Sequence, residues 1–168
     1  LSREPYRRTP AWLAALWRVL AAGLIALCLH SPAPAQPPAP APVVLALHSY
    51  HAGYAWTDTI QAGLVETLRK LSPQAELYVE YMDTKRQPPE AAAPALLSLY
   101  RAKYARIRPS VILASDDGAL DFLLDHKDEL FPGAPVVFCG ISSLSPGRLR
   151  GRTDFTGVAE RTDVRGTI

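Results

Sequence analysis

The segment 43–58, VVLALHSYHAGYAWTD, holds the side chains of this 168-residue chain that are best placed to do chemistry. An apolar run stops at His48, and polar, aromatic and small residues follow before an amphipathic segment begins. This pattern predicts a buried strand, a loop and a helix, in that order. Because ligands bind at the carboxyl ends of strands in open α/β sheets, the loop after His48 is a candidate recognition loop.

The aromatic side chains of this loop could stack on a small ligand, since aromatic rings combine a large contact area with polar handles. The candidates are Tyr50, Tyr54 and Trp56, and the alternative is that they pack the loop onto the domain surface. His48 and His51 stand three residues apart in a loop without a third clear ligand, unlike the fuller sets that hold metals. We therefore expect hydrogen bonding from His48 and no metal.

Two further apolar runs also end in polar or small residues. Ser115, Asp116 and Asp117 follow VILA, and Gly140 and Ser142 close the run after PVVFC. In a doubly wound sheet the carboxyl ends of the strands share one edge, so the three loops would meet at one cleft. The alternatives are helix capping by an aspartate and ordinary turn formation by the serine.

Binding is favoured over catalysis by what these loops lack. Ser49 is not part of a G-x-S-x-G turn, and the chain contains neither a Walker phosphate loop nor G-x-G-x-x-G. We expect no catalytic residue and no cofactor, with a small α/β hydrolase that uses the strand-end loops as the alternative. The residues expected to contact a ligand are Ser49, Tyr50, Trp56, Asp116, Asp117, Gly140 and Ser142.

The charge balance excludes nucleic acid as a partner. The formal net charge is +2, but four of the 18 basic residues and one of the 16 acidic residues precede Gln36. The remainder carries 14 basic and 15 acidic residues, which leaves no basic excess for a phosphate backbone. With 48% hydrophobic residues the composition is that of a globular domain.

The first 35 residues predict a secretory signal peptide. Arginines precede the apolar run Val19–Leu29, which has the length of a signal-peptide core and is short for a bilayer span. Small residues at 33–35 favour cleavage before Gln36, and an uncleaved anchor, interrupted by Arg18, is the alternative. A lipoprotein at Cys28 is disfavoured because a bulky leucine precedes that cysteine.

The Pro/Ala-rich residues 36–42 predict a linker, and the folded part is expected from residue 43. Strands are predicted at Val43–Leu47, Glu76–Met82, Val111–Ala114, Ala134–Cys139 and Phe155–Ala159. Helices are predicted at Ile60–Leu71, with an Asp58/Gln61 capping box, after Pro88-Pro89, and after a cap at Asp116 or Asp117. This alternation predicts an α/β fold with a doubly wound, mostly parallel sheet.

Four blocks carry a resemblance to a known family: HSYHAGYAWTD at 48–58, VEYMDTKR at 79–86, ILASDDGALDFLLDHKDELFPGAPVVFCGI at 112–141, and FTGVAE at 155–160. In this order they resemble the amino-terminal lobe of an ABC-transporter substrate-binding-protein family, a module also found as the extracytoplasmic sensor of bacterial histidine kinases. The resemblance implies a periplasmic-binding-protein-like lobe at 43–157. We expect 158–168 to cross into a second lobe that is truncated here.

The resemblance implies extracytoplasmic binding of a small organic solute, with amino acids among the ligands of relatives, in a cleft between two hinged lobes. The expected location is the periplasm or the extracytoplasmic face of the inner membrane. The expected partner is a membrane permease for ABC import or a fused or separate kinase for signalling, and transport and sensing both stay open. A purely structural interaction domain is a third possibility.

Overall fold

The structure is a computed structural model that describes residues 40–142, 144–145 and 147–160. The predicted signal peptide, its cleavage site, Cys28 and most of the linker lie outside the described residues, as does most of the predicted crossover at 158–168. Within the described part of the chain, no helix is long and apolar enough to cross a membrane.

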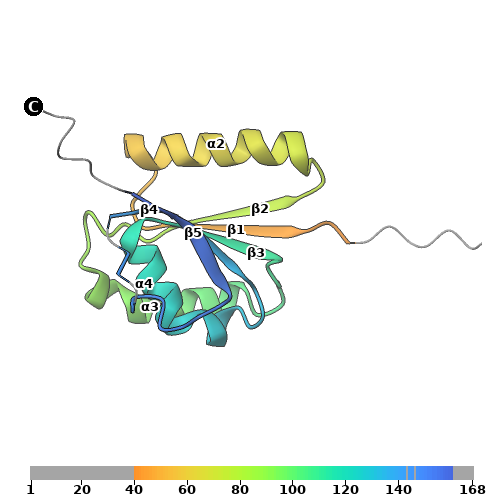
Figure 1. Cartoon of the computed structure of the whole chain (residues 1–168). Coiled ribbons are helices and arrows are strands. Elements are labelled where there is room, and N and C mark those ends of the chain that lie inside the picture. The colour runs from red at the N-terminus through yellow and green to blue at the C-terminus, as the bar shows by residue number, and fades with distance from the viewer. Residues whose placement is uncertain (1–39, 143, 146, 161–168) are drawn as a thin grey trace, which may run out of the picture. The chain divides into compact units, whose positions relative to one another are not determined.

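One five-stranded sheet organises the described residues (Figure 1). Its strands are β1 (Val43–His48), β2 (Glu76–Tyr81), β3 (Val111–Ser115), β4 (Val136–Ile141) and β5 (Phe155–Ala159). Every neighbouring pair is parallel, and the spatial order is β2-β1-β3-β4-β5. The predicted parallel α/β fold is confirmed, and each strand lies within two residues of its predicted position.

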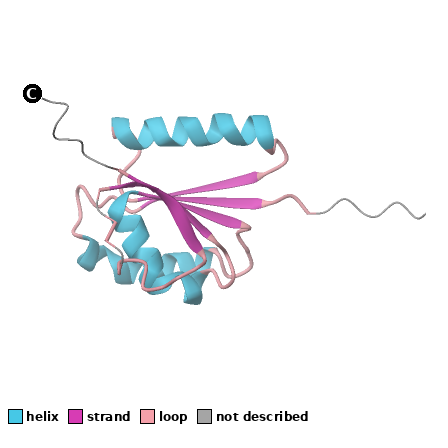
Figure 2. Cartoon of the chain, in the orientation of Figure 1, coloured by secondary structure: helices cyan, strands magenta, loops and turns pink. Residues whose placement is uncertain are grey.

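Helices cover both faces of the sheet. Those described are α2 (Ala55–Leu71), α3 (Pro89–Lys103) and α4 (Asp116–Leu130). Figure 2 shows α2 on one face and α3 and α4 on the other. The chain steps from β1 outward to β2 and then crosses back over β1 to β3, so its direction reverses between β1 and β3. In open α/β sheets the crevice at such a reversal is where ligands bind.

The larger hydrophobic core lies on the α3 and α4 side of the sheet. Leu120 and Leu123 of α4 are fully buried, and Tyr104, the residue after α3, meets Phe131 edge-to-face with ring centroids 5.4 Å apart. By contrast, Thr57 is the buried residue of α2. α4 packs on β3 and β4, and α3 packs on α4. Dense packing of this kind resists displacement.

The start of α2 differs from the prediction. The helix begins at Ala55, so Asp58 and Gln61 lie inside it and form no capping box. Asp58 accepts a hydrogen bond from the Gly53 N–H at 3.0 Å, and Gln61 Oε1 lies 2.9 Å from His48 Nε2. The predicted capping box is wrong because α2 begins three residues before Asp58, and the two side chains contact Gly53 and His48 instead of the helix backbone.

The predicted cap of α4 by an aspartate is also wrong. Asp116 and Asp117 are the first two helical residues, and the residue before them, Ser115, makes no side-chain capping bond. Ser49, from the end of β1, instead accepts a hydrogen bond from the Ala119 N–H at 2.7 Å. The start of α4 is therefore satisfied from a neighbouring strand, which ties the β1 and β3 loops together.

Candidate functional site

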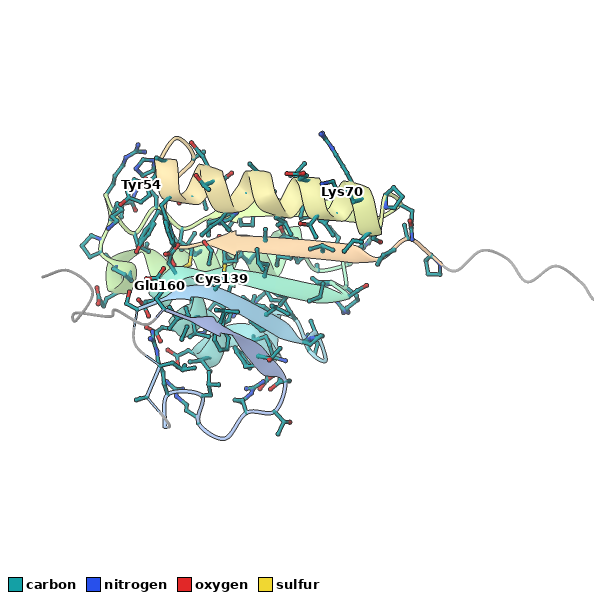
Figure 3. All side chains as sticks on the ribbon, turned by 45° about the horizontal axis from the view of Figure 1, so that its top comes forward. Tyr54, Lys70, Cys139 and Glu160 are labelled. Atoms are coloured by element: carbon teal, nitrogen blue, oxygen red, sulfur yellow. The ribbon has the colours of Figure 1, made fainter. Side chains whose placement is uncertain are left out.

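The polar ends of β1, β3 and β4 meet at one edge of the sheet, as parallel strands require. In Figure 3, Tyr54 at the start of α2 and Glu160 just after β5 lie toward this edge, and Lys70 lies near the other end of α2. The indole N–H of Trp56 donates to Asp116 Oδ1 at 2.9 Å, across sixty residues of sequence. The first turn of α2 and Asp116, at the start of α4, are thus in direct contact.

An open cavity of about 210 Å³ occupies this edge. It is lined by Tyr50, Tyr54, Trp56, Asp116, Gly140, Ser142 and Glu160. The segment between β1 and α2 contributes two tyrosine rings, and the first turn of α2 contributes the Trp56 ring, which the sequence had placed in the loop. The start of α4 contributes one carboxylate, and the residue after β5 contributes another. Two of the predicted ligand-binding residues, Ser49 and Asp117, are not among the lining residues.

Asp116 is the buried acidic group of the cavity, with only 3% of its surface exposed. Trp56 donates to one carboxylate oxygen, and the Ser115 hydroxyl donates to the other at 3.1 Å. Burial raises the pKa of Asp116 above its ordinary value, although both hydrogen bonds act in the opposite direction. Among the described residues no cationic side chain pairs with this carboxylate.

The backbone is strained where it presents Asp116. Asp116 has φ +69°, a left-handed conformation that few residues other than glycine adopt, although aspartate tolerates it better than most. Gly140 faces it with φ +68°, and a Cβ added at Gly140 would lie 2.9 Å from Asp116 Oδ1. Glycine is therefore required at position 140 so that the β4 loop can approach the carboxylate.

His48 is a buried link behind the cavity. Its Nδ1 lies 2.9 Å from Ser115 Oγ, its Nε2 lies 2.9 Å from Gln61 Oε1, and its ring stacks on Tyr81 with centroids 5.3 Å apart. Burial lowers the pKa of His48, more than its hydrogen bond and the nearby carboxylates raise it. His48 thus joins β1, β3 and α2, in line with the predicted hydrogen-bonding role.

Ser49 is fully buried and serves the scaffold. Its hydroxyl donates to the Ser115 carbonyl at 2.8 Å and accepts from the Ala119 N–H. Thr84 donates its hydroxyl to the Ser49 carbonyl at 2.9 Å. Ser49 therefore holds three loops together at the edge of the sheet, and its hydroxyl does not reach the cavity.

Asp117 points to a different environment from Asp116. Arg148 Nη1 lies 2.5 Å from Asp117 Oδ1, and the Ser142 N–H donates to Oδ2 at 3.3 Å. Burial acts to raise the pKa of Asp117, but the hydrogen bonds from Arg148 and Ser142 outweigh it and hold that pKa below its ordinary value. Asp117 is thus neutralised by an arginine and positions the Ser142 backbone beside the cavity.

Sequence reasoning missed Glu160 and Lys85. Glu160 ends the FTGVAE block, and Lys85 lies in VEYMDTKR, so both follow strands whose ends share the edge of the cavity. Lys85 Nζ lies 4.4 Å from the ring centroid of Tyr50 and 5.4 Å from that of Tyr54. Applying the strand-end criterion to β2 and β5 as well would have drawn attention to both residues.

The described residues offer no other obvious chemistry at this edge. No group of three or more histidine, cysteine, aspartate or glutamate side chains among them could hold a metal ion. Cys139 is partly buried, and burial raises the pKa of its thiol, which makes a weak nucleophile.

Comparison with family models, with curated proteins and with solved structures finds no match.

Proposed function

We propose that this chain binds a small organic solute at the carboxyl edge of its sheet, as one lobe of an extracytoplasmic binding protein. The observation that carries the proposal is the cavity in which Tyr50, Trp56 and Asp116 converge beside the reversal point between β1 and β3. Aromatic walls with a few placed polar groups are the usual lining of small-molecule sites. Three of the four sequence blocks that resemble the substrate-binding-protein family, 48–58, 112–141 and 155–160, supply all of the lining residues except Ser142.

The size of the cavity supports a site that needs a second surface. Cavities that enclose a small ligand measure roughly 300–1,000 Å³. The 210 Å³ found here is open, so a ligand lying in it keeps an uncovered side. In the proposed mechanism a second lobe closes on that side and excludes water, and the ligand shifts the population toward the closed form.

Export, location and partners belong to the same proposal. The chain would be exported by its N-terminal segment and would work in the periplasm or at the outer face of the inner membrane. It would deliver its solute to a membrane permease or report the solute to a kinase. The two alternatives differ in what accompanies this lobe, because a sensor also carries a membrane helix and a kinase module, whereas a transport component carries a second lobe alone.

A binding role is favoured over a hydrolase by the state of Ser49. A nucleophilic serine needs a hydroxyl that a substrate can reach and a base beside it. The Ser49 hydroxyl is fully buried and is engaged by the Ser115 carbonyl and the Ala119 N–H. A Ser49→Ala variant is therefore expected to be less stable than the parent. We expect no hydrolase turnover from either protein.

Ligand-observed NMR with the 168-residue chain tests the proposal directly. A library of small organic solutes that includes amino acids is screened against the parent chain and against Tyr54→Leu, which removes a cavity ring that is 36% exposed. Tyr78→Leu is the matched control, because Tyr78 lies on β2 and bonds Glu76 outside the cavity. We expect hits that weaken in Tyr54→Leu alone. Equal binding to both variants, or no hit with the folded parent, would contradict the proposal.

A further inference from the structure

The cavity has a one-sided charge pattern. Its lining contains three aromatic rings and two carboxylates, those of Asp116 and Glu160. Among the described residues, none of those that line it is a lysine, an arginine or a histidine. Such a lining attracts positive charge and repels negative charge.

We propose that the solute is a small organic cation that carries no carboxylate, an amine whose ammonium group lies against the rings of Tyr50 and Trp56 and toward Asp116 and Glu160. The inference rests on the proposed solute-binding function and specifies its ligand class. Aromatic faces carry negative electrostatic potential and bind ammonium groups, and a nearby carboxylate strengthens that attraction.

Asp116 gives the first argument. It is almost completely buried, and its described hydrogen-bond donors, Trp56 and Ser115, are both neutral. A buried carboxylate without a cation is unfavourable, because neutral donors replace only part of its hydration. An ammonium group that enters the cavity would supply the missing opposite charge.

The second argument comes from Tyr50, whose pKa responds to the carboxylates around the cavity. Burial raises the pKa of its hydroxyl, and the charges of Asp116, Asp117 and Glu160 raise it further. Arg148 offsets one of these three carboxylates by pairing with Asp117. The carboxylates of Asp116 and Glu160 line the cavity and remain to act on a ligand.

Lys85 gives the third argument, since it shows that these rings accept an ammonium group. Its Nζ lies 4.4 Å from the centroid of Tyr50, within the usual range of a cation–π contact. Tyr50 and Tyr54 stand edge-to-face with centroids 5.2 Å apart and share this lysine. The chain thus places its own amine on the aromatic wall that a ligand amine would use.

Three probes of nearly the same shape test the ligand class. Phenethylamine is a cation, L-phenylalanine is its zwitterionic counterpart with a carboxylate, and 3-phenylpropionate is an anion. Each is titrated into the 168-residue chain and followed by ligand-observed NMR. We expect phenethylamine to bind at least tenfold more tightly than L-phenylalanine and 3-phenylpropionate to bind least.

Charge-removing variants locate the binding. Glu160 is exposed and lies outside the helices and strands, just after β5. Glu160→Gln is expected to weaken phenethylamine binding about threefold. Asp116→Asn keeps an acceptor for Trp56 and is expected to weaken it about tenfold or more. Glu129→Gln is the matched control, because it lies 13 residues further along α4, about 20 Å from Asp116. Circular dichroism checks that each variant is folded.

The outcomes separate this inference from the proposed function. Tight binding of 3-phenylpropionate, equal binding of L-phenylalanine, or phenethylamine binding unchanged in both Glu160→Gln and Asp116→Asn overturns the inference and leaves a solute site in place. If the folded parent binds none of the three probes and no member of the wider library, the proposed function fails with it. Preferential phenethylamine binding that Glu160→Gln weakens and Glu129→Gln leaves intact supports the inference.

Discussion

Asp116 and Asp117 are neighbours in the chain, yet they belong to two regions with opposite electrostatics. Asp116 faces the cavity, where neutral donors hold it and burial raises its pKa. Asp117 faces the arginine segment, residues 147–154, where Arg148 helps to hold its pKa low. The difference teaches that the residue type alone does not set the environment of an aspartate here: Arg148 pairs with Asp117, whereas the described donors to Asp116 are neutral.

The arginine segment pairs with α4 in a regular pattern. Asp117, Asp121, Asp125 and Asp128 recur at helical spacing on α4. Arg148 contacts the first two, Arg150 lies 2.8 Å from Asp125, and Arg152 lies 2.7 Å from Asp128. This series of ion pairs holds the connection between β4 and β5 against α4. Asp116, one residue before Asp117, lies outside the series and lines the cavity.

The largest expected effect on stability comes from adding a methyl group at Gly140, next to the Asp116 carboxylate. Gly140→Ala places a Cβ 2.9 Å from Asp116 Oδ1 at a backbone φ of +68°, so we expect the free energy of unfolding to fall by about 2–3 kcal/mol. Gly147→Ala, in the arginine segment, adds a Cβ with nothing within 4 Å and is expected to change stability little. Urea unfolding measures both, and equal effects would contradict the account of Gly140.

The two aspartates should respond to pH in opposite directions. Folding raises the pKa of Asp116, so its contribution to stability is present below its unfolded pKa and is lost as pH rises through the folded value. Folding lowers the pKa of Asp117, so its contribution is present above its unfolded pKa and is lost as pH falls through the folded value.

Asparagine variants turn this difference into a measurement. At pH 7 we expect Asp116→Asn to be at least as stable as the parent and Asp117→Asn to be about 0.5–1 kcal/mol less stable, because its ion pair is partly exposed. Lowering the pH below about 3.9, the ordinary pKa of aspartate, should shrink both differences. Urea unfolding at several pH values is the measurement, and parallel pH profiles for the two variants would argue against distinct environments.

Removing the lysine that already lies on the aromatic wall should sharpen the recognition side of the comparison. Lys85→Gln frees the Tyr50 and Tyr54 rings from a competing ammonium group, and we expect phenethylamine to bind about two- to fivefold more tightly. Lys70→Gln, on the exposed surface of α2, is the matched control. A weaker affinity in Lys85→Gln would mean that this lysine assists the ligand instead of competing with it.

The smallest effect is expected at the exposed end of the ion-pair series. Asp125 and Arg150 have half or more of their side-chain surfaces exposed, so Asp125→Asn should lower the free energy of unfolding by no more than about 0.5 kcal/mol. The loss should vanish in 1 M NaCl, because salt screens exposed charges. A larger loss that persists at high salt would show that this pair does more than hold an exposed connection.

Local pattern was sufficient for the sheet and for part of the site. The apolar runs that become β1, β3 and β4 are short and end abruptly, which pointed to parallel strands and to polar loops on one edge. Tyr50, Trp56 and Asp116 were accordingly expected at that edge, and they line the cavity. Glu160 and Lys85 follow β5 and β2, and the same strand-end criterion places both at this edge.

The sequence by itself determined the alternation of strands and helices and the chemistry available at the strand ends, because periodicity and chain order are local properties. Only the tertiary structure decided which groups became partners. Ser49 accepts a hydrogen bond from Ala119, seventy residues away, and does not line the cavity. Arg148 forms an ion pair with Asp117, whereas Asp116 has no ion-pair partner among the described residues. Burial and pairing depend on neighbours that folding brings from distant parts of the chain, and these two properties set the charge that the cavity presents.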